Sequence, residues 1–193
     1  MNGRYTCDDS LFVTDFGVGT NSVVVYKDAY NSNVSIRAAF NISGTGADNA
    51  LESSTYRAEF LAGIKGGWEN STTGVYVAES STGIKIDIVN GGGTSNVSNF
   101  FGGFVEAFWS PSNPGTVTMY AQGVTSQNFK ETAAHEFGHI LGIDDGYNNN
   151  TYKYYDSIMC DPHSKRNGTG KASSLDIAKA IKAYQTKKFQ KWR

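Results

Sequence analysis

The chain has 193 residues, a formal net charge of −1 at pH 7, and a composition that is 39% hydrophobic and 13% aromatic. This apolar content excludes a disordered chain, and the balanced charge excludes the basic field that nucleic-acid-binding proteins use. No apolar run approaches the roughly 18 residues that a membrane span needs. We therefore expect a single domain over residues 1–193, with neither nucleic acid nor membrane as a partner.

Residues 1–33 are polar and rich in Gly and Asn, with one strand-like run, "SVVVY", at 22–26. We treat 1–33 as an N-terminal extension whose place in the fold is undefined. The first ten residues lack the apolar centre of a signal peptide. This leaves a cytosolic protein, a mature or excised domain, or export by another route, and we expect a secreted or exported protein.

The next segments alternate between strand and helix patterns. Residues 34–42 read as a strand, and 48–68 as a helix in which Ala58, Leu61, Ile64 and Trp68 recur at steps of three and four. Period-two runs predict strands at 73–80 and 83–90, and two more are expected at 102–111 and 115–123.

The last third predicts two helices separated by an irregular stretch. The first spans about 128–142, with Asn128 and Glu131 at capping-box spacing. The second, 173–189, follows Ser173 or Ser174 as its cap and should point Leu175, Ala178, Ile181 and Tyr184 inward. We read the basic "KKFQKWR" at the C-terminus as a solvated helix end. This order of elements predicts an α/β or α+β domain.

Two histidines occupy one side of the 128–142 helix. His135 and His139 stand four residues apart, opposite an apolar arc that includes Phe137 and Leu141. Both imidazoles can therefore reach one metal ion. Glu136 points beside the ion, where it suits a base acting on a metal-bound water.

A catalytic zinc usually has three protein ligands and one open position. No glutamate follows Glu136, so the remaining candidates for a third ligand downstream are His163, Asp144, Asp145, Asp156, Asp161 and Asp176. Gly142 can adopt the left-handed conformation at the helix end and return residues 143–145 toward the ion.

"HEFGHILGIDD" (135–145) resembles the metzincin pattern HExxHxxGxx(H/D). The resemblance implies that Asp145 completes the ligand set His135, His139 and Asp145, a minority variant found in snapalysin-like proteases. "DSIMCDP" (156–162) resembles the Met-turn of that clan, with Met159 beneath the metal ligands. The family fold would be a twisted, mostly parallel sheet with a backing helix, an active-site helix and a C-terminal helix.

The resemblance further implies a zinc endopeptidase that acts on a protein or peptide substrate. Two imidazoles and a carboxylate suit Zn²⁺, although affinity alone would admit copper or nickel. Residues 102–111 would form an edge strand that pairs with extended substrate, and the loop 160–172 one wall of the specificity pocket. We expect a monomer, with an inhibitor or immunity protein as a further candidate partner.

Some residues depart from the family pattern or keep several interpretations. Asp161 stands where some metzincins have a tyrosine ligand, and the tyrosines that could stabilise an oxyanion instead are Tyr147, Tyr152, Tyr154 and Tyr155. Cys7 and Cys160 could form a disulfide or remain free thiols, and we favour the disulfide. A latency role for Cys7, as in matrixin prodomains, fits its neighbours poorly because Asp8 and Asp9 disfavour the thiolate.

Two other functions remain compatible with the motif. The chain could be a toxin or effector protease domain of restricted specificity, which suits its small size and its N-terminal extension. It could also be a zinc-stabilised binding module without catalysis. Glu136 argues against the module, because a structural site needs no base and is usually closed by a fourth ligand.

Overall fold

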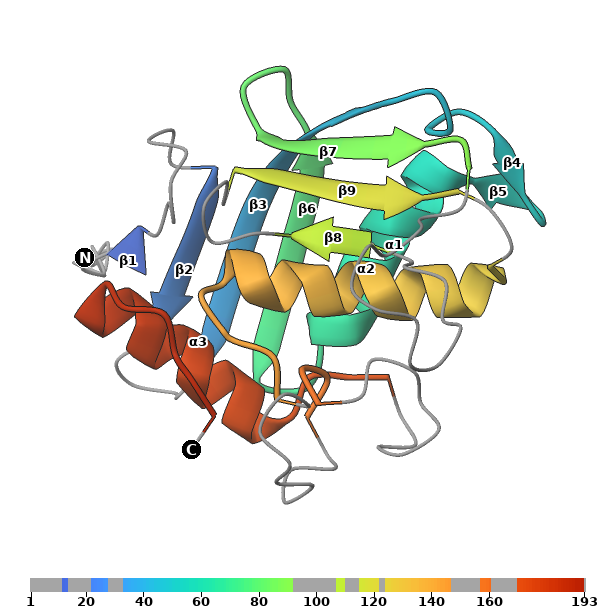
Figure 1. Cartoon of the computed structure of the whole chain (residues 1–193). Coiled ribbons are helices and arrows are strands. Elements are labelled where there is room, and N and C mark those ends of the chain that lie inside the picture. The colour runs from blue at the N-terminus through green and yellow to red at the C-terminus, as the bar shows by residue number, and fades with distance from the viewer. Residues whose placement is uncertain are drawn as a thin grey trace, which may run out of the picture.

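The computed structural model describes residues 12–13, 22–27, 33–91, 107–109, 115–121, 124–146, 157–160 and 170–192. Three helices and a mixed sheet make up these parts of the chain, which confirms the expected α+β class (Figure 1). Within these ranges, none of the helices has the length and apolar character required to cross a membrane.

The strands form one seven-stranded sheet and one small hairpin. The strand order of the seven-stranded sheet is β1-β2-β3-β7-β9-β8, and β6 also pairs with β3. The strands are β1 (Phe12–Val13), β2 (Val23–Lys27), β3 (Val34–Ser43), β4 (Ala50–Leu51), β5 (Ser54–Thr55), β6 (Thr73–Glu79), β7 (Ile84–Val89), β8 (Ala107–Trp109) and β9 (Thr116–Tyr120). The helices are α1 (Tyr56–Trp68), α2 (Ser126–Ile140) and α3 (Ser174–Thr186).

The sheet is mixed instead of mostly parallel. Its middle is parallel, because β3 pairs with β6 and β7, and β7 pairs with β9. Antiparallel strands close both sides: β2 pairs with β3 at one side, and β8 pairs with β9 at the other. The expected strand at 22–26 is thus β2, which joins part of the N-terminal region to the sheet.

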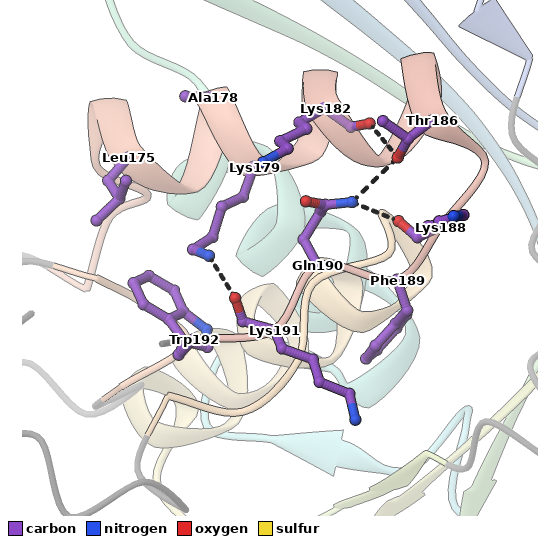
Figure 2. A pocket seen from close by; sticks show the side chains of 10 residues that line it. All are labelled: Leu175, Ala178, Lys179, Lys182, Thr186, Lys188, Phe189, Gln190, Lys191 and Trp192. Carbon is purple, nitrogen blue, oxygen red and sulfur yellow. Dashed lines mark hydrogen bonds between the residues drawn. The ribbon is translucent and has the colours of Figure 1, made fainter.

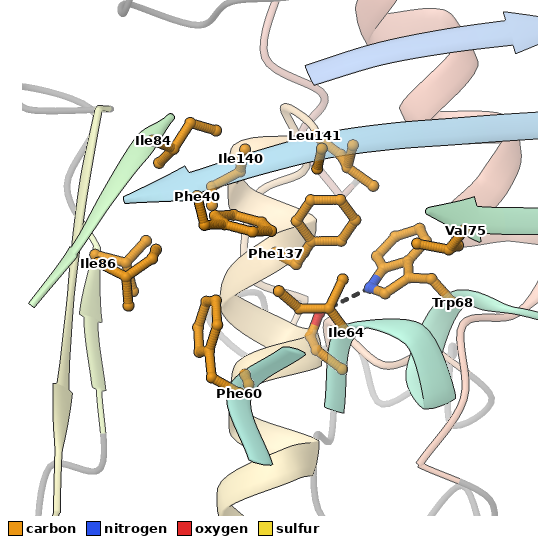
Figure 3. Close-up of a cluster of buried hydrophobic side chains, with 14 of the residues drawn as sticks. Phe40, Phe60, Ile64, Trp68, Val75, Ile84, Ile86, Phe137, Ile140 and Leu141 are labelled. Atoms are coloured by element: carbon orange, nitrogen blue, oxygen red, sulfur yellow. Dashed lines mark hydrogen bonds between the residues drawn. The ribbon is translucent and has the colours of Figure 1, made fainter. Parts of the chain in front are cut away.

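The hydrophobic core lies against one face of the sheet. Alternate residues of β3 are buried, as expected for a strand with one covered face. Phe40 of β3 meets Phe60 of α1 and Phe137 of α2, with ring centroids 5.3 Å and 5.9 Å apart in edge-to-face geometry (Figure 3). The two helices therefore cover the same face and meet over it.

Helix α1 begins at Tyr56 and not at the expected position 48. Residues 48–55 form a turn and the β4–β5 hairpin, and Thr55 caps the helix by accepting a hydrogen bond from the Ala58 backbone N–H. Of the four residues expected to face inward, Ile64 and Trp68 are buried, whereas Ala58 is exposed and Leu61 is half-buried. The polar residues before Tyr56 favour a cap and a turn over a helix interior.

Helix α2 also begins earlier than expected. Thr125, and not Asn128, is the N-cap, since its side chain accepts a hydrogen bond from the Asn128 backbone N–H. Both residue types are good caps, so composition alone did not separate them.

Helix α3 begins as expected after Ser173, which forms a capping box with Asp176. Its buried face, however, agrees only in part with the expected one, of which Tyr184 is buried. Leu175 and Ala178 are exposed, while the buried apolar positions are Ile177, Ala180, Ala183 and Tyr184.

The helix ends at Thr186, and the left-handed conformation of Lys187 (φ 54°) turns the chain back. The basic C-terminus is therefore not a solvated helix end, and Trp192 is buried.

Candidate metal centre

Three side chains of α2 form a buried group that could hold a metal ion. Ligand atoms of His135, Glu136 and His139 lie within 4.8 Å of one another. The three residues are 4%, 7% and 6% exposed, respectively. Both the polar side and the apolar side of α2 are therefore buried. The residues that follow the helix fold back over the polar side.

The turn after α2 is a Schellman motif. Gly142 has φ 84°, its N–H donates to the His139 carbonyl at 2.8 Å, and the Ile143 N–H donates to the Gly138 carbonyl at 3.0 Å. The left-handed turn expected at Gly142 is confirmed. It brings Asp145 Oδ1 to 3.1 Å from His135 Nε2 and 3.2 Å from His139 Nε2.

The other ring nitrogen of each histidine contacts a backbone carbonyl. His135 Nδ1 lies 2.9 Å from the Ile158 oxygen, and His139 Nδ1 lies 2.8 Å from the Ile143 oxygen. A carbonyl only accepts, so each Nδ1 must carry the hydrogen. In a neutral imidazole this assigns the lone pair to Nε2, which is the arrangement found in metal-ligating histidines.

Three acceptors consequently converge at one point. Asp145 Oδ1 lies 3.1 Å from the Nε2 lone pair of His135 and 3.2 Å from that of His139, and this is unfavourable unless a cation lies among them or an imidazole is protonated. Two imidazoles and one carboxylate are a donor set that fits zinc, with one position left for water. The residues present therefore fit a metal ion.

The charges within the group depend on one another. Burial disfavours the protonated form of His135, but the hydrogen bond that a protonated Nε2 donates to Asp145, together with the charge of Glu136, outweighs burial and raises its pKa. Burial also disfavours the ionised form of Asp145, yet the hydrogen bonds that it accepts from imidazoles protonated on Nε2 hold its pKa well below its usual range. The site thus keeps a carboxylate and attracts positive charge.

Glu136 differs from its neighbours in having an unpaired oxygen. In the part of the chain that the structure describes, Glu136 Oε2 is buried and has no hydrogen-bond partner. Burial raises the pKa of Glu136, although the two histidines lower it in part. A buried carboxylate oxygen without a partner is costly, and it is available to exchange a proton with a bound molecule.

Residues 157–160 form a tight turn beneath the histidines, in which the Cys160 N–H donates to the Ser157 carbonyl at 3.1 Å. Met159 is fully buried, and a Cβ atom on Gly138 would lie 2.1 Å from its sulfur. Gly138 lies between His135 and His139 on α2, so Met159 packs directly under the group.

The turn is fixed from below by Asp176 of α3. Its carboxylate accepts hydrogen bonds from the Ser157 hydroxyl and, at 3.2 Å, from the Ile158 backbone N–H. Asp176 therefore orients the carbonyl that meets His135. It was one of the sequence candidates for a metal ligand, but it lies at the helix cap and not in the group. The capping-box spacing of Ser173 and Asp176 is the signal that could have located it.

Of the two neighbouring aspartates, Asp144 accepts a hydrogen bond from the Asp145 backbone N–H at 3.0 Å, while Asp145 reaches the histidines. The backbone carbonyls of Ile143 and Ile158 were not identified from the sequence, and carbonyls carry no sequence signal.

The other candidates lie outside the described residues: His163, Asp156, Asp161, the four tyrosines between 147 and 155, and most of the loop 160–172.

Cys160 is a free thiol, and burial raises its pKa to about 11. This favours free thiols over the disulfide that we expected. Cys7, the other partner of that disulfide, lies outside the described residues.

No protein family model matches this chain, and no curated protein is significantly similar to it in sequence.

Proposed function

We propose that this chain is a zinc-dependent endopeptidase of the metzincin type, in which His135, His139 and Asp145 hold the metal. The observation that carries the proposal is the position of Asp145 Oδ1, which lies 3.1 Å from His135 Nε2 and 3.2 Å from His139 Nε2. Both histidines are oriented through Nδ1 by backbone carbonyls, as metal-ligating histidines commonly are by the hydrogen bond of their other ring nitrogen. A bound zinc ion supplies a Lewis acid that polarises the scissile carbonyl and activates water.

Glu136 is the general base in this proposal. Its unpaired Oε2 accepts a proton from the water that attacks the peptide carbonyl. It then donates this proton to the nitrogen of the leaving amine, which completes hydrolysis without a covalent intermediate on the protein. A raised pKa suits this exchange, because it makes the Glu136 carboxylate a better acceptor of the proton from water. A purely structural metal site would have no use for this carboxylate.

The sheet offers a binding edge for an extended peptide. β8 ends the strand order and pairs only with β9 among the described strands, and it lies beside α2 (Figure 1). A substrate that adds to this edge would form main-chain hydrogen bonds, which tolerate varied side chains. We therefore propose a protein or peptide substrate, bound along β8 and cleaved at the α2 group.

Cleavage of a peptide library tests this function. The protein loaded with one equivalent of Zn²⁺ is incubated with the library, and products are identified by mass spectrometry. We expect internal cleavages that stop when a chelator is added and resume when zinc is restored. Cleavage that continues in the chelator, or a zinc-loaded protein that cleaves nothing, would contradict the proposal.

A further inference from the structure

The last residues of the chain run beside the loop that carries Asp145. After the left-handed turn at Lys187 the chain reverses, and Gln190 forms a parallel bridge with Ile143. Gln190 and Trp192 are 9% and 3% exposed, respectively. This segment is therefore packed into the protein near the end of α2.

Three hydrogen bonds join this segment to the loop. The Gln190 N–H donates to the Gly142 carbonyl at 2.7 Å, and the Asp144 N–H donates to the Gln190 carbonyl at 3.0 Å. The Trp192 indole N–H donates to the Asp144 carbonyl at 2.6 Å. The two backbone groups of Asp144, immediately before Asp145, are thus both held by the C-terminal segment.

The segment is in turn attached to α3 (Figure 2). The Gln190 side-chain amide donates to Thr186 Oγ1 at 3.1 Å and to the Lys188 carbonyl at 2.7 Å. Lys179 Nζ donates to the Lys191 carbonyl at 2.8 Å and lies 4.4 Å from the centre of the Trp192 ring. Helix α3 therefore supports the loop through residues 190–192.

We propose that residues 190–192 position the metal site, with the Trp192 indole fixing the third ligand. The inference rests on the proposed function, since it assumes that Asp145 is a metal ligand. The Schellman turn fixes the loop at Ile143, and the Gly146 N–H donates to the Met159 carbonyl at 2.8 Å. Between these two points, the C-terminal segment holds the backbone of Asp144. It therefore sets the backbone position from which the Asp145 side chain extends.

The same segment supports His139 indirectly. The Ile143 carbonyl that accepts from His139 Nδ1 lies between Gly142 and Asp144, which are both hydrogen-bonded to Gln190. Residues 190–192 thus act on the metal site without touching the ion. Trp192 is a positioning residue and not a catalytic one.

Trp192→Phe is the main test, because phenylalanine keeps a ring in the buried position and removes the N–H donor. Zn²⁺ affinity of the full chain is measured by competition with a chromophoric chelator. We expect a loss of about 10-fold or more, since changes to outer partners of metal ligands typically cost 10–100-fold. Leu175→Ala, on the exposed side of α3 in the same groove, is the control and should bind Zn²⁺ like wild type (Figure 2).

A second readout separates positioning from a general loss of stability. The visible spectrum of the Co²⁺-substituted Trp192→Phe protein should shift toward that of Asp145→Ala. In a double-mutant cycle, adding Trp192→Phe to Asp145→Ala should weaken Zn²⁺ binding by much less than it does alone, because the two residues act through one ligand. Far-UV circular dichroism and thermal unfolding of the metal-free proteins show that each variant is folded.

Each outcome decides between the two claims. If the wild-type protein binds Zn²⁺ no more tightly than His139→Ala does, the metal site and this inference are both overturned. A Trp192→Phe protein that binds Zn²⁺ as tightly as wild type would overturn only the positioning role. The positioning role would also be overturned if the loss of Zn²⁺ affinity caused by Trp192→Phe added in full to the loss caused by Asp145→Ala.

Discussion

Gly67 of α1 and Ala134 of α2 are in such close contact that a Cβ atom on Gly67 would lie 2.4 Å from the Cβ of Ala134. Real Cβ atoms do not approach so closely, so only glycine fits at this crossing. The neighbouring Trp68 indole donates to the Ala134 carbonyl at 2.8 Å. Since Ala134 directly precedes His135, this contact sets the position of the first histidine against the core.

Gly67→Ala should therefore destabilise the protein. We expect a loss of about 1–3 kcal/mol in the free energy of unfolding, the usual effect of overpacking a core. Gly66→Ala is a matched control one residue away, because a Cβ there would meet nothing within 4 Å. It should stabilise the protein by about 0.5–1 kcal/mol, since alanine is favoured over glycine in a helix. Urea unfolding of both variants checks the pair, and equal effects would contradict the close helix contact.

Asp145→Ala should lower zinc content far more than Asp144→Ala does. Asp145 contacts both Nε2 atoms, whereas Asp144 accepts a backbone hydrogen bond. Elemental analysis after dialysis against a limited zinc concentration gives the stoichiometry. We expect about one zinc per chain in wild type and Asp144→Ala, because one three-ligand site binds one ion. Equal zinc in the two variants would rule out Asp145 as the ligand.

The stability of the metal-free protein should fall as the pH rises above neutrality. The pKa of His135 is raised in the folded state, whereas an unfolded histidine titrates near about 6.5. The folded protein therefore retains this proton to higher pH. The resulting stabilisation is fully present below about pH 6.5 and is lost as the pH passes the folded pKa.

Urea unfolding in chelator at several pH values between 6 and 9 measures this slope. Asp145→Asn should flatten it, because the hydrogen bond to Asp145 is the strongest influence that raises this pKa, and the charge of Asp145 raises it further. Glu136, whose pKa is also raised, remains in both proteins and contributes a slope of the same sign, which the charge of Asp145 increases. An unchanged slope in Asp145→Asn would show that the carboxylate does not hold the proton.

Cys160 should react slowly with iodoacetamide in the folded protein. Burial raises its pKa to about 11, so the thiolate at pH 8 is scarcer by roughly 10²-fold than in an ordinary cysteine with a pKa of about 8.5. After unfolding without reductant, mass spectrometry should find two alkylated cysteines. A protein that stays unmodified after unfolding would instead contain the Cys7–Cys160 disulfide.

The site helix and the side chains that converge on it were predictable because their spacing has a direct physical meaning. His135 and His139 share a helix face at any choice of helix ends, so the error at the N-cap did not matter. Gly142 marked the turn that returns Asp145. By contrast, the inward face of α3 was only partly right. Tyr184 is buried as expected, but Leu175 and Ala178 are exposed, and Ile177 and Ala180, which have the same three-residue spacing, are buried instead.

The supporting contacts could not be read from the sequence. The carbonyls of Ile143 and Ile158 orient the histidines, and any residue provides a carbonyl. Lys187 turns the chain in a left-handed conformation that usually belongs to glycine. The basic residues around it resembled a solvated helix end, although Trp192 is buried against the loop of the metal centre.

Glu136→Gln gives the most direct test of the proposed mechanism. Glutamine preserves the shape of the side chain but cannot accept a proton from water, and loss of a general base typically costs about 10²–10⁴-fold. Zinc content and peptide turnover are to be measured on the same sample. The account predicts about one bound zinc, as for a single three-ligand site, with turnover reduced by at least about 10²-fold. Wild-type turnover in a Glu136→Gln protein that retains its zinc would contradict it.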